Sequence, residues 1–129
     1  MAADRGLAVE AALGRFAAHA LLRLLGFKRL VRTLGRGTGR PPDPLLVTRI
    51  AAAVNRNAKG GANSCLRRAF AAAWMLRMRG MMPRLHYGVR RWEGEMQAHA
   101  WLEVEGLPVV GYDQAPDFAL LASFPPDNP

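Results

Sequence analysis

The chain contains a single cysteine, Cys65, among its 129 residues. One cysteine cannot form an internal disulfide, and it leaves no partner for a zinc knuckle or a dithiol redox pair. We therefore expect no metal site, no cofactor, and a reducing, cytoplasmic setting. Cys65 is either a small core residue or a nucleophile, and its surroundings must decide between the two.

Long uninterrupted apolar runs are also missing. The opening residues MAADRGLAVEAALGR have no basic stretch followed by an apolar core, so they lack the pattern of a secretory signal. A membrane span needs about 18 residues without charge, and Glu10, Arg15 and Arg23 interrupt the apolar residues here. With 50% hydrophobic residues, the composition predicts one globular domain rather than a disordered segment.

Acidic residues are scarce: 10 Asp and Glu stand against 18 Lys and Arg, which gives a net charge of +8 and a pI of about 11.2. This balance favours a nucleic acid, an anionic membrane or an acidic peptide as partner. The sequence has no signature of a nucleic-acid-binding fold, and its aromatic residues are not interleaved with basic ones, so we expect no nucleic-acid partner. A non-catalytic basic module that binds nucleic acid or membrane stays open as an alternative function.

Residues 6–34 have the pattern of one or two helices with a broad apolar surface. Arg15, His19 and Arg23 follow one another at intervals of four and form a polar stripe, so we expect the rest of this helix to be buried. The apolar members are Leu7, Leu13, Phe16, Ala20, Leu21, Leu24, Leu25, Leu30 and Leu34. A helix lying on a membrane surface is the alternative, so peripheral membrane contact of this segment stays open.

The segment GRGTGRPPDP at 35–44 is rich in glycine and proline, which predicts a linker. We therefore divide the chain into a helical segment with its linker at 1–40 and a core at 41–129, packed together as one compact domain. A short helix is expected over 45–54. The polar loop over 55–61 follows, and its two glycines allow tight backbone geometry.

The next helix opens beside the cysteine, in the stretch GGANSCLRRAF. Asn63 and Ser64 are both favourable N-cap residues, and Gly80 marks the end of the helix. The first turn of a helix has free amide donors and a partial positive charge, which together stabilise a thiolate and an oxyanion. This position makes Cys65 a candidate nucleophile. Asn63 or Asn57 is a candidate second donor to an oxyanion in a bound substrate, although the N-cap role is the preferred explanation of Asn63.

After this helix the apolar period changes to two, which predicts strands over 84–90, 96–104 and 107–112. The dipeptide Glu105-Gly106 is a tight-turn signal, and Pro108 places the third strand at a sheet edge. We expect the proline-rich tail after this strand to wrap around the domain or to fray. Helices followed by an antiparallel sheet predict an α+β fold.

His99 changes the interpretation of Cys65. It lies on the strand face opposite its two alanine neighbours, so it is either solvated or lines a site. A strand packed on the helix of Cys65 would bring the two side chains within reach as a thiolate–imidazolium pair. His86 is the competing base, on a face that the pattern predicts to be exposed. Trp101 shares the face of His99 and is a candidate to line a substrate groove or, alternatively, a packing residue.

A third group should orient the imidazole, and the candidates are Asp113, Asp117 and Glu103. A two-residue turn between the second and third strands places Asp113 on the wrong face. One extra residue in the loop, or a bulge at Gly111, brings Asp113 opposite His99. Glu103 shares the face of His99 but lies about 13 Å away along the strand. We therefore choose Asp113, with an amide or a backbone carbonyl as the alternative.

The motifs around these residues resemble the transglutaminase-like cysteine peptidases of lasso-peptide biosynthesis. The resemblance rests on the alanine-rich helix that Cys65 opens, on the strand HYGV at 86–89 and on the hairpin segment AHAWLEVEG at 98–106. It covers about residues 55–113, and the hairpin segment is its most specific element. It implies a papain-like, transglutaminase-like fold with N-terminal helices packed on a small antiparallel sheet.

The resemblance also implies an activity, with Cys65 as nucleophile, His99 as general base and then acid, and Asp113 as the third member. Such peptidases cleave the leader from a ribosomally made precursor peptide, after which a separate lasso cyclase closes the ring. The segment at 1–40 is too short and too helical for the β-containing leader-recognition domain of some members, so we expect a separate leader-binding partner. An acyltransferase of the same fold is the enzymatic alternative. The basic residues that receive an acidic leader or a partner surface, or alternatively form a solvated face, are Arg67, Arg68, Arg77, Arg79, Arg84, Arg90 and Arg91.

Overall fold

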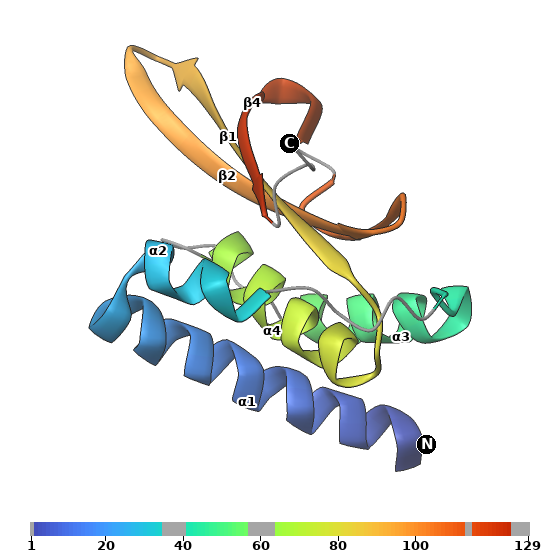
Figure 1. The fold of residues 1–129 in the computed structure, drawn as a ribbon. Coiled ribbons are helices and arrows are strands. Elements are labelled where there is room, and N and C mark those ends of the chain that lie inside the picture. The colour runs from blue at the N-terminus through green and yellow to red at the C-terminus, as the bar shows by residue number, and fades with distance from the viewer. Residues whose placement is uncertain (1, 35–40, 57–63, 113–114, 125–129) are drawn as a thin grey trace.

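The computed structural model describes residues 2–34, 41–56, 64–112 and 115–124, in which four α-helices pack on a four-stranded antiparallel sheet (Figure 1). The helices form one layer and the sheet forms the other. The helix that contacts three strands of the sheet, α4, also contacts the helices on its other side. This is the α+β architecture that the sequence pattern predicts.

The N-terminal segment is helical in its described part, apart from Gly26. α1 spans Ala2–Leu25, and Gly26 separates it from the short α2 (Phe27–Leu30) and the 3-10 turn η1 (Val31–Leu34). None of the helices in the described ranges has the length and apolar character that crossing a membrane requires.

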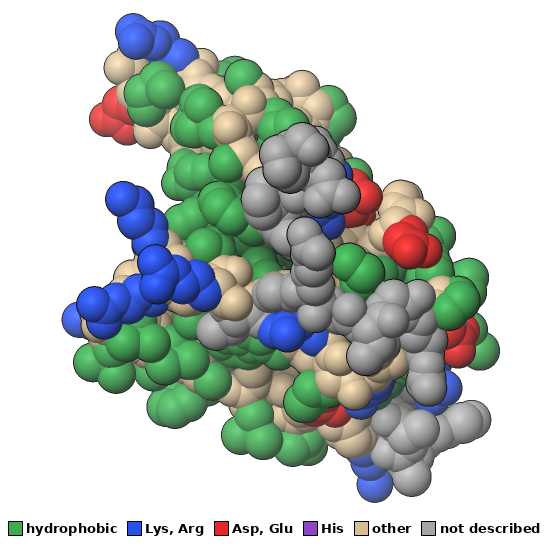
Figure 2. Space-filling model, in the orientation of Figure 1, with side chains coloured by type: hydrophobic (Ala, Val, Ile, Leu, Met, Phe, Trp, Pro, Cys, Tyr) green, Lys and Arg blue, Asp and Glu red, His purple; other side chains and the backbone are tan. Residues whose placement is uncertain are grey.

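The helix α1 is buried on one side only, which corrects the expectation that its whole apolar surface packs inward. Leu7 and Ala11 are buried against other helices, whereas Leu13 and Phe16 are 64% and 73% exposed. The reason is the position of α1 at the outside of the helical layer, where α3 and α4 contact its inner side (Figure 1). Hydrophobic side chains therefore lie along the edge of the molecule that α1 forms (Figure 2).

The helix α3 (Pro44–Asn55) begins with Pro44, which we had expected to end the linker. Asp43 caps this helix: its Oδ1 accepts hydrogen bonds from the backbone N–H groups of Leu45 and Leu46 at 3.1 and 3.3 Å. Proline suits the first turn because a backbone N–H there would have no intrahelical acceptor.

The helix α4 (Ser64–Met78) is the centre of the helical layer. Its alanines, Ala69 and Ala71–Ala73, are fully buried, and their small size lets neighbouring helices approach closely. The contact with α1 is close: a Cβ at Gly14 would lie 2.9 Å from the Cβ of Ala71. Any side chain at Gly14 would therefore push α1 away from α4.

The sheet begins with the three predicted strands, β1 (Pro83–Trp92), β2 (Glu95–Val104) and β3 (Leu107–Val110), joined by two-residue turns. A fourth strand, β4 (Ala119–Phe124), pairs with the free edge of β1, so the strand order is β3-β2-β1-β4. Pro108 lies in the edge strand β3, as the sequence predicts.

The strand β4 corrects the expectation that the tail wraps or frays. Residues 119–124, ALLASF, show no alternation of apolar and polar side chains, and the first three are exposed. The segment thus lacks both the alternating pattern and the burial of a typical half-buried strand. It forms a strand because its backbone pairs with β1. One face of the sheet packs on α4 through Leu85, Ala100, Leu102 and Val104, which belong to the same hydrophobic cluster as Leu7 of α1.

Candidate active site

Cys65 is the second residue of α4, in the first turn of the helix. Its backbone N–H has no intrahelical acceptor and lies at the positive end of the helix dipole, which is the environment that stabilises a thiolate and an oxyanion. The side chain is half-buried and lines a small cavity of about 70 Å³. The other lining residues are Leu66, Tyr87, Ala98, His99 and Ala100.

His99 also lines this cavity, but its ring stacks on Trp101, on the sheet face opposite the one that packs on α4, so its predicted pairing with Cys65 stays a prediction. It is 6% exposed and is the one buried polar or charged residue in the described part of the chain, so it is not the solvated surface histidine that the sequence left open. Phe118 and Trp101 pack on its ring at centroid distances of 5.0 and 6.0 Å. Within the described residues, no hydrogen bond joins the Cys65 thiol to His99.

The imidazole of His99 is held by the main chain: its Nε2 lies 2.8 Å from the carbonyl oxygen of Gly111. A carbonyl only accepts, so Nε2 carries the proton, and Nδ1 of the neutral ring is left as the basic nitrogen. Gly111 has φ +78°, and a Cβ there would lie 2.9 Å from His99 Nε2 and 2.6 Å from the Ala100 oxygen. Only glycine fits this position, because both the backbone conformation and the close approach exclude a side chain.

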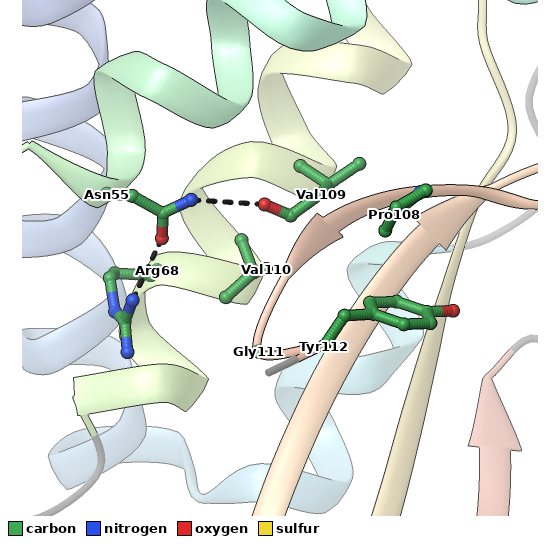
Figure 3. Close-up of a pocket in the computed structure, with 7 residues that line it drawn as sticks. All are labelled: Asn55, Arg68, Pro108, Val109, Val110, Gly111 and Tyr112. Atoms are coloured by element: carbon green, nitrogen blue, oxygen red, sulfur yellow. Dashed lines mark hydrogen bonds between the residues drawn. The ribbon is translucent and has the colours of Figure 1, made fainter. Parts of the chain in front are cut away.

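A larger cavity of about 330 Å³ lies on the other side of this segment, between α3, α4 and β3 (Figure 3). Asn55 joins the three elements: its Nδ2 donates to the Val109 oxygen at 3.1 Å, and its Oδ1 accepts from Arg68 at 2.8 Å. Gly111 and Tyr112 form the opposite wall. The sequence pattern predicts a polar loop at Asn55, whereas this residue ends α3. An asparagine at the end of a helix is too common to indicate a role.

Asp113 and Asn63, together with Asn57, lie outside the described residues, so their predicted roles stay predictions. For Asp113 to lie opposite His99, the segment that pairs with β2 must contain one extra residue. The structure gives the pairing of β2 with β3 up to Val110. Val104 pairs with Leu107, but Leu102 pairs with Val110, so β3 contains one extra residue relative to β2. The extra residue lies within β3, before Gly111, whereas the sequence placed it in the loop or at Gly111.

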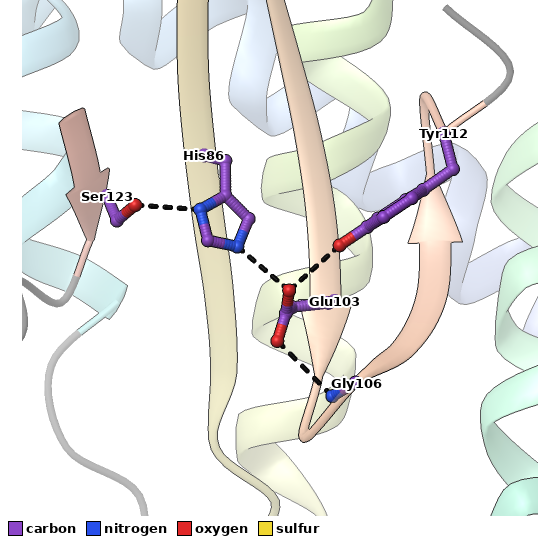
Figure 4. A network of polar contacts seen from close by, with 5 residues as sticks. All are labelled: His86, Glu103, Gly106, Tyr112 and Ser123. Atoms are coloured by element: carbon purple, nitrogen blue, oxygen red, sulfur yellow. Dashed lines mark hydrogen bonds and ion pairs between the residues drawn. The ribbon is translucent and has the colours of Figure 1, made fainter. Parts of the chain in front are cut away.

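The two other acidic candidates make contacts elsewhere. Asp117 is 65% exposed, and its Oδ2 lies 3.8 Å from Arg90. Glu103 accepts a hydrogen bond from the Tyr112 hydroxyl at 2.8 Å and lies 2.9 Å from His86 Nε2 (Figure 4). The partner of His99 within the described chain is the Gly111 carbonyl, the backbone alternative that the sequence had left open.

His86 belongs to this polar network and does not line the cavity of Cys65. Its Nδ1 lies 2.7 Å from Ser123 Oγ on β4, and its side chain is only 12% exposed, so the expectation of an exposed face was wrong. The reason is β4, which the sequence pattern did not predict and which supplies Ser123. The network therefore joins three strands on the sheet face opposite the helices (Figure 4).

The network also fixes the residue next to Gly111. Burial alone would raise the pKa of Glu103, but hydrogen bonds from Tyr112, His86 and the Gly106 N–H outweigh it and lower that pKa. Burial and the hydrogen bond to Glu103 raise the pKa of Tyr112. Near neutral pH the carboxylate is thus charged and the phenol protonated, which keeps Tyr112 tied to β2 and its neighbour Gly111 in place.

Trp101 fills the space between the two histidines. Its ring stacks on His86 at 5.9 Å and on His99 at 6.0 Å, and the residue is 8% exposed. This position makes it a wall that limits the movement of both imidazoles. Its predicted contact with substrate stays a prediction. No group of three His, Cys, Asp or Glu side chains suited to a metal ion occurs in the described ranges.

A comparison with protein families identifies a match. The family model described as Transglutaminase-like superfamily matches residues 8–123, which run from within α1 to within β4 and include Cys65 and His99. No curated protein and no solved structure matches the chain. Because the match covers most of the sequence, this chain belongs to the transglutaminase-like superfamily.

Proposed function

We propose that this protein is a cysteine peptidase that removes the leader from a lasso-peptide precursor. The observation that carries the proposal is the single cavity lined by Cys65, in the first turn of α4, and by the buried His99, whose Nε2 is held by the Gly111 carbonyl. Membership of the transglutaminase-like superfamily supports thiol chemistry at this site. The hairpin segment at 98–106 supports the narrower assignment to lasso-peptide leaders.

The chemistry is amide hydrolysis in two steps. Cys65 Sγ attacks the scissile carbonyl carbon while His99 Nδ1 takes the thiol proton, and the Cys65 N–H stabilises the oxyanion. His99 then gives the proton to the departing amine of the core peptide, and the leader stays on Cys65 as a thioester. Water attacks the thioester with its proton going to Nδ1, which releases the leader carboxylate and restores the thiol.

Recognition of the leader is assigned to a separate protein, and ring closure to a separate lasso cyclase. Residues 2–34 are helical apart from Gly26, whereas the fused leader peptidases of lasso-peptide biosynthesis recognise the leader with a β-containing domain. The freed amine of the core is the product that the cyclase would consume.

The test combines the precursor peptide, the leader-binding partner and this protein, with products identified by mass spectrometry. We expect a leader with a free carboxylate and a core with a free amine, whose masses add up to precursor plus one water. Cys65→Ala should abolish cleavage, and His99→Ala should slow it by about 10²- to 10⁴-fold. His19→Ala, at an exposed position of α1, is the matched control and should cleave normally.

Unchanged cleavage by Cys65→Ala would contradict the proposal. A leader joined to an added amine, in place of a free leader, would assign the same thiol to acyl transfer instead.

A further inference from the structure

The outward side of α1 is an apolar stripe that the described chain leaves uncovered. Val9, Leu13, Phe16 and Leu24 are 60%, 64%, 73% and 79% exposed. At 3.6 residues per turn these four and Ala20 fall within an arc of about 80°. We call these five residues the α1 stripe; it runs along most of a 24-residue helix. Leu7 and the other buried residues of α1 lie on the opposite side.

Basic side chains border the α1 stripe. Arg5 and Arg23 are exposed and lie within about 20° of Phe16 around the helix. Beyond α1, Lys28, Arg29 and Arg32 are also exposed, and Figure 2 shows Lys and Arg side chains gathered over α2, beside the hydrophobic edge of α1.

The acidic charge of this region is already engaged. Glu10 is the one acidic residue in the sequence from 5 to 34. Both of its carboxylate oxygens accept hydrogen bonds from Arg79 of α4 at 2.8 Å, and this ion pair lowers the pKa of Glu10. Among residues 5–34, the surface around the α1 stripe therefore combines exposed apolar side chains with an excess of exposed basic side chains.

We infer that α1 docks the protein onto an anionic lipid surface, with the helix axis parallel to the membrane. The α1 stripe would enter the boundary between headgroups and acyl chains, and the bordering basic residues would contact anionic headgroups. Each basic side chain near such a surface strengthens binding about five-fold, equivalent to about 1 kcal/mol.

Charge argues against a second copy of this chain as the occupant. Pairing two α1 stripes would bring Arg5 and Arg23 of both molecules together, between chains that each carry a net charge of +8. An anionic bilayer instead offers opposite charge along the whole helix. Docking in this way also leaves the cavity of Cys65 accessible, because that cavity lies between α4 and the sheet, on the other side of the helical layer from the α1 stripe (Figure 1).

The inference does not depend on the proposed peptidase activity, and its test needs no substrate. The complete chain is sedimented with vesicles of phosphatidylcholine alone or of an equal mixture of phosphatidylcholine and phosphatidylglycerol, at low salt. We expect binding to the mixed vesicles, weak binding to phosphatidylcholine alone, and release as salt is added, because salt screens the charges.

Two pairs of variants locate the contact. Phe16→Glu with Leu24→Glu should weaken binding more than about ten-fold, since each side chain would lose its burial in lipid. Leu45→Glu with Met96→Glu is the matched control: these positions are 68% and 62% exposed on other elements, and the charge change is the same. Phe16→Ser with Leu24→Ser repeats the comparison without added charge, and circular dichroism checks that every variant is folded.

Two further double variants measure the electrostatic contribution to vesicle binding. Arg5→Gln with Arg23→Gln should reduce the preference for phosphatidylglycerol by about 25-fold, two steps of the five-fold effect of one basic residue. Arg56→Gln with Arg91→Gln, at exposed positions outside α1, should reduce it less.

Three results would overturn the inference. The first is the absence of binding to the mixed vesicles. The second is a loss of vesicle binding in the Leu45/Met96 control equal to that in the Phe16/Leu24 variants. The third is a defined dimer at low salt that the Phe16/Leu24 substitutions dissociate.

Discussion

At the scale of single residues, the unusual feature of the site is that a main-chain carbonyl, from Gly111, orients the imidazole of His99. A backbone carbonyl cannot be removed by substitution. The contact can be tested at Gly111 itself, because only glycine lets the backbone come this close to His99. Glycine is required here for two reasons: the backbone has φ +78°, and a Cβ would lie 2.9 Å from His99 Nε2.

Gly111→Ala should therefore lower the reactivity of Cys65 and destabilise the fold by about 2 kcal/mol or more, because it adds backbone strain to a steric clash. The measurements are the rate of alkylation of Cys65 by iodoacetamide and urea denaturation. Gly106→Ala is the matched control: Gly106 also has positive φ, +86°, but a Cβ there has nothing within 4 Å. If both variants react at the same rate, the Gly111 contact does not orient His99.

At the scale of elements, the network around Glu103 ties together β1, β2, β4 and the segment that follows β3 (Figure 4). The stabilisation that this network gives the folded protein depends on the charge of the Glu103 carboxylate. The pKa of Glu103 is lower in the folded protein, so the stabilisation is present above the unfolded pKa of about 4.3. It is lost as the pH falls through the lower, folded value.

Glu103→Gln should accordingly reduce the free energy of unfolding by about 1–2 kcal/mol near neutral pH, where hydrogen bonds to a charged group are lost. The difference from the parent protein should disappear in acid, below the folded pKa. Urea denaturation at a series of pH values measures it. Glu105→Gln, an exposed neighbour in the same turn, should show no such pH-dependent difference; a constant difference for Glu103→Gln at all pH values would exclude the electrostatic cause.

The elements differ in how far the sequence predicts them. Alternating apolar residues predict β1, β2 and β3, and the helix start predicts the position of Cys65, because these features depend on local pattern. The strand β4 depends on pairing with a distant edge, and ALLASF carries no signal of that partner. The buried state of His86 was missed for the same reason, since Ser123 reaches it from β4. The role of Gly111 is a backbone contact, and the sequence offers only an unspecified carbonyl as an alternative to Asp113.

At the scale of the whole molecule, Phe27 of α2 connects the N-terminal helices to the rest. Its ring lies 6.1 Å from Phe70 of α4, 5.2 Å from Tyr87 of β1 and 5.6 Å from Phe124 of β4. One aromatic side chain thus contacts both layers of the fold. The two predicted segments, 1–40 and 41–129, should for this reason unfold together.

Phe27→Ala should lower the free energy of unfolding by about 3 kcal/mol, as removal of a packed aromatic ring does. The transition should stay single, with tryptophan fluorescence and far-ultraviolet circular dichroism giving the same midpoint. Phe16→Ala is the control, because Phe16 is 73% exposed and its removal should change stability by less than about 0.5 kcal/mol. Two separate transitions in the parent protein would show that the segments fold independently.

The α1 stripe has a further consequence for concentrated solutions of the protein without lipid. The net charge of +8 then provides the repulsion that keeps the apolar surfaces of different molecules apart. That repulsion acts only over about 8 Å at physiological ionic strength and over shorter distances in stronger salt. Light scattering should therefore detect self-association that grows with ionic strength, whereas attachment to anionic vesicles weakens. Low salt keeps the purified protein dispersed, and the same condition favours its adsorption to acidic surfaces.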